Sequence, residues 1–210
     1  QQQNPIAFIQ TCLQPEIKDV VEKVSLRGGS LEPEFYTLFG DNKVEYLCYT
    51  NQYYLPCVMQ QPMLKQHIES EIKKNIENPV QSCFISLQEN FRGRGYQVDI
   101  RIGNVDVELL PERVVTTMNY SVTLTKTNTE SYNSFNVVLN NNLYELVNIA
   151  NNILEWEATY GDVEIKKYMA DYRDLKVEQN AKSDGSKIYV LTDSDTGDKF
   201  QFAVRSIVYQ

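Results

Sequence analysis

Residues 97–109 decide the fold, and they read Gln97-Val98-Asp99-Ile100-Arg101-Ile102-Gly103-Asn104-Val105-Asp106-Val107-Glu108-Leu109. On both sides of Gly103-Asn104, apolar side chains alternate with polar ones, which is the pattern of strands with one buried face and one wet face. A two-residue loop that begins with glycine fits a type II′ hairpin between these strands. The alternation continues over residues 114–124, so the sequence predicts an antiparallel sheet that is covered on one side.

Helical periodicity marks the segments that cover this sheet. Residues 4–25 repeat apolar side chains at helical spacing, with a kink or restart expected at Pro15. Arg27-Gly28-Gly29 ends this helix, because glycine adopts left-handed backbone angles without a steric penalty. A second helix is expected from Pro62 to Glu77, closed by Asn78-Pro79.

The C-terminal half adds a third helix and a β-meander. Asn142 is expected to cap a helix over residues 142–156, with Glu145 three positions on as in a capping box. A short helix follows from Asp162. Three strands are expected at 175–180, 187–192 and 199–209, separated by polar turns.

Together these elements predict an α+β fold in which an antiparallel curved sheet is packed by three main helices, in a single domain with a C-terminal β-meander. Within it, residues 1–29 form an N-terminal amphipathic helix. This helix is expected either to lie next to a membrane anchor or to mediate assembly. Residues 30–210 form an extracytoplasmic α+β domain.

Composition narrows the classes of protein to consider. The chain has 210 residues, of which 42% are hydrophobic and 23% charged, so it buries a core and is not disordered as a whole. Its net charge is −8 at pH 7. A surplus of acidic groups argues against a nucleic-acid binder, which needs Lys and Arg against the phosphates.

The cysteines indicate the compartment. Cys12, Cys48, Cys57 and Cys83 match no zinc spacing, and an even, clustered set favours two disulfides in an oxidising compartment over four reduced thiols in the cytosol. Of three pairings, we favour Cys48–Cys57, because residues 44–50 and 53–58 have the pattern of neighbouring strands. That choice leaves Cys12 to join the first helix to Cys83.

The sequence contains no motif that identifies a reaction. His67 is the single histidine and is expected to be partly buried on a helix. The acidic run 193–198 lacks the glycine and glutamate positions of a calcium loop, so a hairpin turn is favoured. The glycine-rich run 92–96 is interpreted as a turn and not as an RNA-binding box. We expect no cofactor and no metal. An acid–base pair of a hydrolase would need two carboxylates, but the candidates are expected to be solvated surface groups, namely Asp99, Asp106, Glu108, Glu155 and Glu157.

Tyrosine is the best functional hint. The chain has 14 tyrosines, more than a core needs, and exposed tyrosine contacts proteins or sugars at a low entropy cost. The expected interaction surface consists of Tyr36, Tyr46, Tyr49, Tyr53 and Tyr54. Asn119-Tyr120-Ser121 is the single N-glycosylation sequon, on the polar face of its strand, and either carries a glycan in a secreted protein or occurs by chance.

The order of features near the N-terminus resembles a known group. Phe8-Ile9-Gln10-Thr11-Cys12-Leu13, followed by the helix up to Arg27-Gly28-Gly29, is similar to a signature of uncharacterised membrane-anchored archaeal surface proteins, especially those of small-genome symbionts. The similarity extends, in order, over most of the chain, but the pair Cys48 and Cys57 is not part of the signature. It implies an extracytoplasmic α+β domain behind an anchor helix that precedes Gln1, and it supplies no catalytic residues.

From these observations we expect a non-enzymatic extracytoplasmic cell-surface protein with a structural or adhesive role, as a self-assembling filament or envelope subunit. Its partners would be copies of itself or other cell-envelope proteins, with no nucleic acid and with membrane contact only through the anchor. The alternative is a small-ligand or glycan-binding module on the cell surface. A hydrolase with two carboxylates is the third hypothesis.

Overall fold

The computed structural model describes residues 3–207. Helix α1 (Pro5–Leu26) begins at Asn4, whose Oδ1 accepts a hydrogen bond of 2.7 Å from the backbone N–H of Ala7. The restart expected at Pro15 is wrong, because α1 is continuous, and the alternative, a kink, stays a prediction. Pro15 has no N–H to donate to the carbonyl of Thr11. Both residues lie on the exposed side of the helix, where that carbonyl is open to water.

Helix α2 (Leu64–Gly93) also runs through a proline. The sequence predicts an end at Asn78-Pro79, but the apolar stripe continues to Phe91 and stays buried. Burial of that stripe outweighs the cost of about 3 kcal/mol for a proline inside a helix. The buried stripe consists of Leu64, Ile68, Ile72, Ile76, Val80, Cys83, Phe84, Leu87 and Phe91.

The predicted hairpin at Gly103-Asn104 is wrong. Strand β4 (Gln97–Arg101) pairs with β7 (Ser121–Thr125), whereas β5 (Val105–Leu110) pairs with β6 (Arg113–Met118). The chain reverses instead at Pro111-Glu112, where Glu112 has a left-handed φ of 63°. Residues 97–110 and 113–125 are therefore two long antiparallel segments that are interrupted midway.

Gly103 allows close contact between these segments at the interruption. An added Cβ would lie 1.8 Å from the backbone oxygen of Asn119, and the Asn119 N–H donates to the Asn104 carbonyl at 2.8 Å. Three residues on one segment (102–104) face two on the other (119 and 120) here, which is the register shift of a bulge. Glycine is present because the backbones touch.

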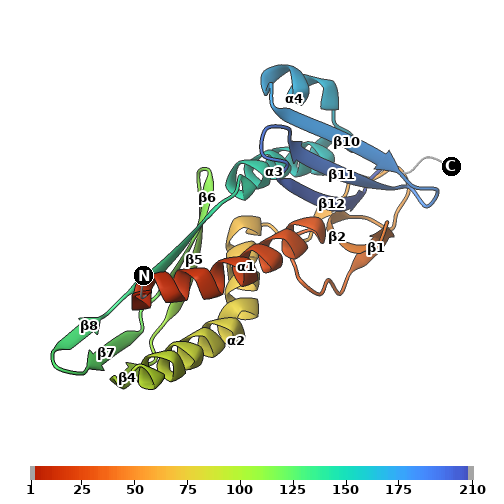
Figure 1. Cartoon of the computed structure of the whole chain (residues 1–210). Helices are drawn as coiled ribbons and strands as arrows, with labels where there is room; N and C mark the ends of the chain where they lie inside the picture. The colour runs from red at the N-terminus through yellow and green to blue at the C-terminus, as the bar shows by residue number, and fades with distance from the viewer. Residues whose placement is uncertain (1–2, 208–210) are drawn as a thin grey trace.

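A third segment completes this ribbon. Strand β8 (Thr129–Tyr132) pairs with β7, and β9 (Phe135–Asn140) pairs with β6, which gives two three-stranded sheets in succession, β4-β7-β8 and β5-β6-β9. The β4-β7-β8 end extends away from the rest of the strands, alongside the C-terminal part of α2 (Figure 1).

The remaining strands form a six-stranded sheet in the order β1-β2-β12-β11-β10, with β3 also paired to β2. They are β1 (Tyr36–Phe39), β2 (Asn42–Tyr49), β3 (Val58–Met59), β10 (Leu175–Ala181), β11 (Ser186–Asp193) and β12 (Lys199–Arg205). The C-terminal meander is confirmed, although β12 ends at Arg205 and residues 208 and 209 of the expected strand lie outside the described residues. All pairs are antiparallel except β12–β2, a parallel pair between distant segments that was not predicted.

This sheet is curved, as expected. Lys182, which follows β10, donates from Nζ to Thr37 Oγ1 at 2.6 Å and to the Leu38 carbonyl at 2.9 Å, both in β1 at the opposite end of the strand order. A small second core lies against the inner face, formed by Val44, Tyr46, Ile188, Val190 and Ala203.

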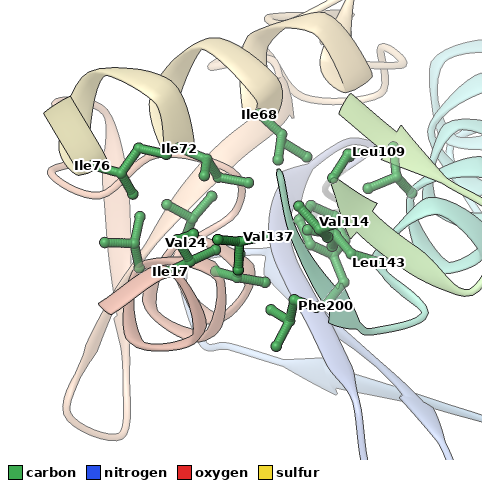
Figure 2. Packing of buried hydrophobic residues seen from close by; sticks show 14 of the residues in the cluster. Ile17, Val24, Ile68, Ile72, Ile76, Leu109, Val114, Val137, Leu143 and Phe200 are labelled. Carbon is green, nitrogen blue, oxygen red and sulfur yellow. The ribbon is translucent and has the colours of Figure 1, made fainter. Parts of the chain in front are cut away.

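The main core joins every layer. Helix α1 packs against α2, β9 and β12, while α3 (Leu143–Tyr160) packs against β11, β12 and α2. Figure 2 shows side chains of α1, α2 and α3 meeting those of β5, β6, β9 and β12 in one continuous cluster. The α+β fold class and the single domain are thereby confirmed, with the strands divided among three sheets. The short helix expected after Asp162 is also present, as α4 (Ile165–Asp171).

The expected capping box of α3 is wrong. Asn142 makes no side-chain cap and donates from Nδ2 to Asp193 at 2.7 Å, while Glu145 accepts from the Glu112 N–H at 2.8 Å. Asn141 accepts from the Leu143 N–H instead. The two residues that fit a capping box therefore connect α3 to the β11–β12 and β5–β6 turns.

Candidate functional site

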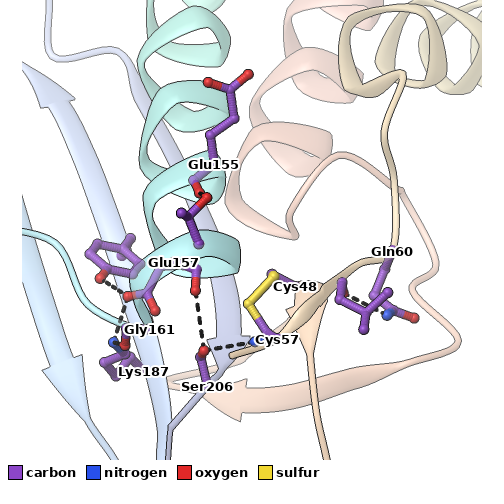
Figure 3. Close-up of a disulfide and its surroundings, with 11 residues drawn as sticks. Cys48, Cys57, Gln60, Glu155, Glu157, Gly161, Lys187 and Ser206 are labelled. Atoms are coloured by element: carbon purple, nitrogen blue, oxygen red, sulfur yellow. Dashed lines mark hydrogen bonds and ion pairs between the residues drawn. A yellow bond between two sulfur atoms is a disulfide. The ribbon is translucent and has the colours of Figure 1, made fainter. Parts of the chain in front are cut away.

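The four cysteines form the two pairs that the sequence favours. Cys12–Cys83, here called the long-range disulfide, joins α1 to α2 across 71 positions. Cys48–Cys57, the short-range disulfide, joins β2 to the residue before β3 (Figure 3). The two segments are neighbours as predicted, but the strand expected over 53–58 is wrong, because β3 covers only Val58–Met59. Two disulfides are compatible with an extracytoplasmic domain, because the cytosol keeps thiols reduced.

Three of the five tyrosines of the expected interaction surface are exposed and a fourth is half-buried, and their role in binding stays a prediction. Tyr36, Tyr53 and Tyr54 are exposed and Tyr49 is half-buried. Tyr46 is only 6% exposed, so its assignment to an interaction surface is wrong. The alternation of β2 turns Tyr46 to the inner face of the curved sheet, where its hydroxyl lies 2.6 Å from Ser186 Oγ.

Exposed apolar side chains are concentrated in the stretch of sequence that carries these tyrosines. Residues 3–207 include sixteen exposed large hydrophobic side chains, and eight of them belong to residues 35–63. Leu38 on β1 is 60% exposed and Val58 on β3 is 66% exposed. We call this set the 35–63 apolar surface; it consists of Phe35, Tyr36, Leu38, Tyr53, Tyr54, Leu55, Val58 and Met63.

A buried ionic network lies at the C-terminal end of α3. Glu157 is fully buried, so the expectation that it is solvated is wrong. Its Oε1 accepts hydrogen bonds from Lys187 Nζ at 2.5 Å and from the Tyr189 hydroxyl, whereas its Oε2 has no partner among the described residues (Figure 3). Lys187 also reaches Asp162 at 3.3 Å. Burial raises the pKa of Glu157 despite the neighbouring ammonium, and burial next to Glu157 raises the pKa of the Tyr189 hydroxyl.

This network connects to the short-range disulfide. Ser206 Oγ accepts from the Cys57 N–H at 2.8 Å and donates to the Glu157 backbone oxygen at 3.3 Å (Figure 3). The network lies behind a surface hollow of about 410 Å³ that Lys187 and Ser206 help to line, but Glu157 and Tyr189 do not reach that hollow. We therefore assign the network a role in stability.

A second hollow of about 540 Å³ lies between α3 and α4 and opens to solvent. Asn148, Asn152 and Trp156 line it from α3, where a spacing of four residues places them on one side of the helix. Tyr168 and Tyr172 line it from the α4 side. No motif in the sequence predicted this group. The available signal was a tryptophan in phase with two asparagines, outside the buried stripe of the helix.

The other sequence candidates occupy ordinary structural positions. His67 is partly buried as expected, with Nε2 2.7 Å from Ser30 Oγ, and burial lowers its pKa. The run 193–198 is the β11–β12 turn, as favoured. Asn119 is exposed at the break between β6 and β7, and its glycosylation stays a prediction. The carboxylates expected to be solvated are exposed except Glu157, namely Asp99, Asp106, Glu108 and Glu155.

The β11–β12 turn is held by one carboxylate. Asp193 Oδ1 accepts from the backbone N–H groups of Asp195 and Thr196 at 2.9 and 3.1 Å, and its Oδ2 accepts from Asn142. Burial opposes ionisation of Asp193, but these hydrogen bonds prevail and lower its pKa below the ordinary 3.8. Asp193 thus has a structural role in the turn.

Comparison with protein-family models, curated proteins and solved structures gave no match. No helix within residues 3–207 combines the length and the apolar run that crossing a bilayer requires.

Proposed function

We propose that this protein is a non-enzymatic, extracytoplasmic surface protein with a structural or adhesive role. In this proposal it associates with copies of itself or with other cell-envelope proteins through the 35–63 apolar surface. The observation that carries the proposal is the concentration of eight exposed large hydrophobic side chains in these residues. Exposed apolar groups gathered in one region of a soluble domain mark interaction surfaces.

The chemistry of the surface favours side-chain contact over strand addition. Strand β1 is an edge strand, but the Leu38 carbonyl already accepts a hydrogen bond from Lys182. A lysine at an edge discourages pairing with another strand. The exposed Tyr36, Tyr53 and Tyr54 bury a large area and lose little conformational freedom on binding.

The compartment rests on the two disulfides and on the resemblance to anchored archaeal surface proteins. Attachment through an N-terminal anchor belongs to the same proposal. The single histidine offers no support for catalysis, because His67 is engaged with Ser30 on the flank of α2.

Light scattering over a range of protein concentrations tests the proposal. We expect the mass-average molar mass to grow with protein concentration, or the protein to bind isolated cell envelopes. The double variant Leu38→Lys/Val58→Lys should lose both properties. Ile102→Lys is the matched control, since Ile102 is 73% exposed but lies next to β4, outside the 35–63 apolar surface. A protein that stays monomeric up to about 1 mM and ignores cell envelopes contradicts the proposal, as does equal loss in the control.

A further inference from the structure

The hollow between α3 and α4 has the size and the lining of a ligand site. Its volume of about 540 Å³ falls within the range of about 300–1,000 Å³ typical of small-molecule pockets. We propose that it binds a neutral pyranose sugar, as a free saccharide or as the exposed unit of a glycan.

Partly exposed aromatic rings line the hollow. Trp156 is 44% exposed and Tyr172 is 52% exposed, although both line a concave surface where a core ring would be covered. Tyr160 lies against Trp156, with ring centroids 4.9 Å apart, and supports the indole. Flat apolar faces that stay wet in the free protein match the C–H faces of a pyranose ring.

Two side-chain amides, of Asn148 and Asn152, also line the hollow. The Tyr168 hydroxyl donates to Asn152 Oδ1, and burial raises the pKa of Tyr168, so this donor stays protonated. Because that bond fixes the Asn152 carbonyl, the amide NH₂ is left without a partner among the described residues. The Asn148 side chain likewise has no hydrogen-bond partner within residues 3–207. Sugar hydroxyls donate and accept, so they suit a pair of amides.

Charge selects among sugars. The charged side chains around the hollow are Glu164, Asp171 and Lys167, two acids against one base. The chain as a whole carries a net charge of −8. Repulsion therefore disfavours uronic acids, sialic acids and phosphorylated sugars, and leaves neutral pyranoses as the matching class.

The proposed sugar site is independent of the 35–63 apolar surface, since the two share no residue. Failure of either proposal therefore leaves the other intact.

Trp156 is the only tryptophan in the chain, so its fluorescence and its single indole N–H resonance report on this hollow alone. We would titrate the full chain with the methyl pyranosides of glucose, galactose, mannose and N-acetylglucosamine. Glucuronate tests the effect of charge, and sorbitol tests the need for a ring. We expect a saturable change with at least one neutral pyranoside below about 50 mM, and no saturable change with sorbitol or glucuronate.

Variants then locate the binding. Tyr172→Ala removes one ring and should weaken binding by about tenfold. Tyr53→Ala, an exposed tyrosine of the 35–63 apolar surface, should leave binding unchanged. The proposal is overturned if no pyranoside shifts the indole signal, if sorbitol or glucuronate binds as well as the neutral sugars, or if Tyr172→Ala and Tyr53→Ala bind with equal affinity.

Discussion

Lys187→Met tests the buried network at the end of α3. In the folded protein, Lys187 Nζ lies 2.5 Å from Glu157 Oε1 and is the only cationic group paired with that carboxylate among the described residues. The variant leaves Glu157 fully buried, with the Tyr189 hydroxyl as the remaining donor to its side chain. Breaking a buried ion pair in this way costs about 3–5 kcal/mol of stability.

The pH dependence of this loss follows from protonation. In the variant, Glu157 avoids a buried charge by taking up a proton. Its ordinary pKa is 4.5, and each pH unit above that value is worth about 1.36 kcal/mol. Protonation at pH 7 therefore costs about 3.4 kcal/mol. At pH 5 the same protonation costs about 0.7 kcal/mol. The loss caused by Lys187→Met should therefore shrink by up to about 2.7 kcal/mol between pH 7 and pH 5.

The wild-type protein also becomes more stable through Glu157 as the pH falls, so about 2.7 kcal/mol is an upper bound on the difference. Burial raises the pKa of Glu157 in the folded state. The folded protein then binds the proton more tightly than the unfolded chain, so this group's contribution is complete below pH 4.5 and declines as the pH rises through the folded-state pKa. The two proteins must be compared at each pH.

Urea unfolding with both disulfides intact, followed by circular dichroism at pH 7 and pH 5, measures the effect. The matched control is Lys176→Met, which removes an exposed ion pair with Glu178 and should cost less than about 1 kcal/mol at both pH values. Adding Glu157→Gln to Lys187→Met removes the ionisable group, so the difference in stability between this double variant and Glu157→Gln alone should not depend on pH. A loss below about 1 kcal/mol at pH 7, or an equal loss at both pH values, refutes the reasoning.

Three further outcomes are expected. Replacing both cysteines of the long-range disulfide with serine should lower the free energy of unfolding by about 4 kcal/mol, and the same change in the short-range disulfide should lower it by about 3 kcal/mol. The difference arises because the longer loop restricts the unfolded chain more. Urea unfolding that gives the reverse order contradicts this expectation. Gly103→Ala should lower the melting temperature sharply and Gly93→Ala should not, since an added Cβ meets the Asn119 backbone only at the first position; equal melting temperatures would contradict the close contact. Asp193→Ala should cost about 1–2 kcal/mol of stability at pH 7, as measured by urea unfolding. This loss should vanish as the pH falls through the lowered folded-state pKa of Asp193. Asp195→Ala, at an exposed position of the same turn, should show neither effect.

Local patterns predicted the parts of the fold that depend on local physics. The stripe of α1, the glycines that end it and the meander after residue 175 follow from periodicity and turn chemistry. The pairing of Cys48 with Cys57 followed from two neighbouring strands, and the remaining pair was then determined.

The failures share a cause, which is that contacts between distant segments override a local signal. Pro79 lies inside α2 because the stripe beyond it is buried, and Gly103 marks contact with Asn119 and not a turn. Glu157 resembles a solvated helix-end carboxylate until β11 brings Lys187 and Tyr189 to it. The parallel β12–β2 pair joins strands that no local pattern connects.

The short-range disulfide also bears on the proposed adhesive role. It closes the loop that carries Tyr53, Tyr54 and Leu55, and the Leu55 carbonyl accepts a hydrogen bond of 2.9 Å from the Ile207 N–H. Within this loop Tyr54 has a left-handed φ of 61°, a strained conformation that persists only where the surrounding structure enforces it. A loop fixed in this way has already lost the freedom that binding would otherwise remove, so its exposed rings contact a partner at a smaller entropy cost. The same covalent bond therefore stabilises the fold and preorganises part of the 35–63 apolar surface.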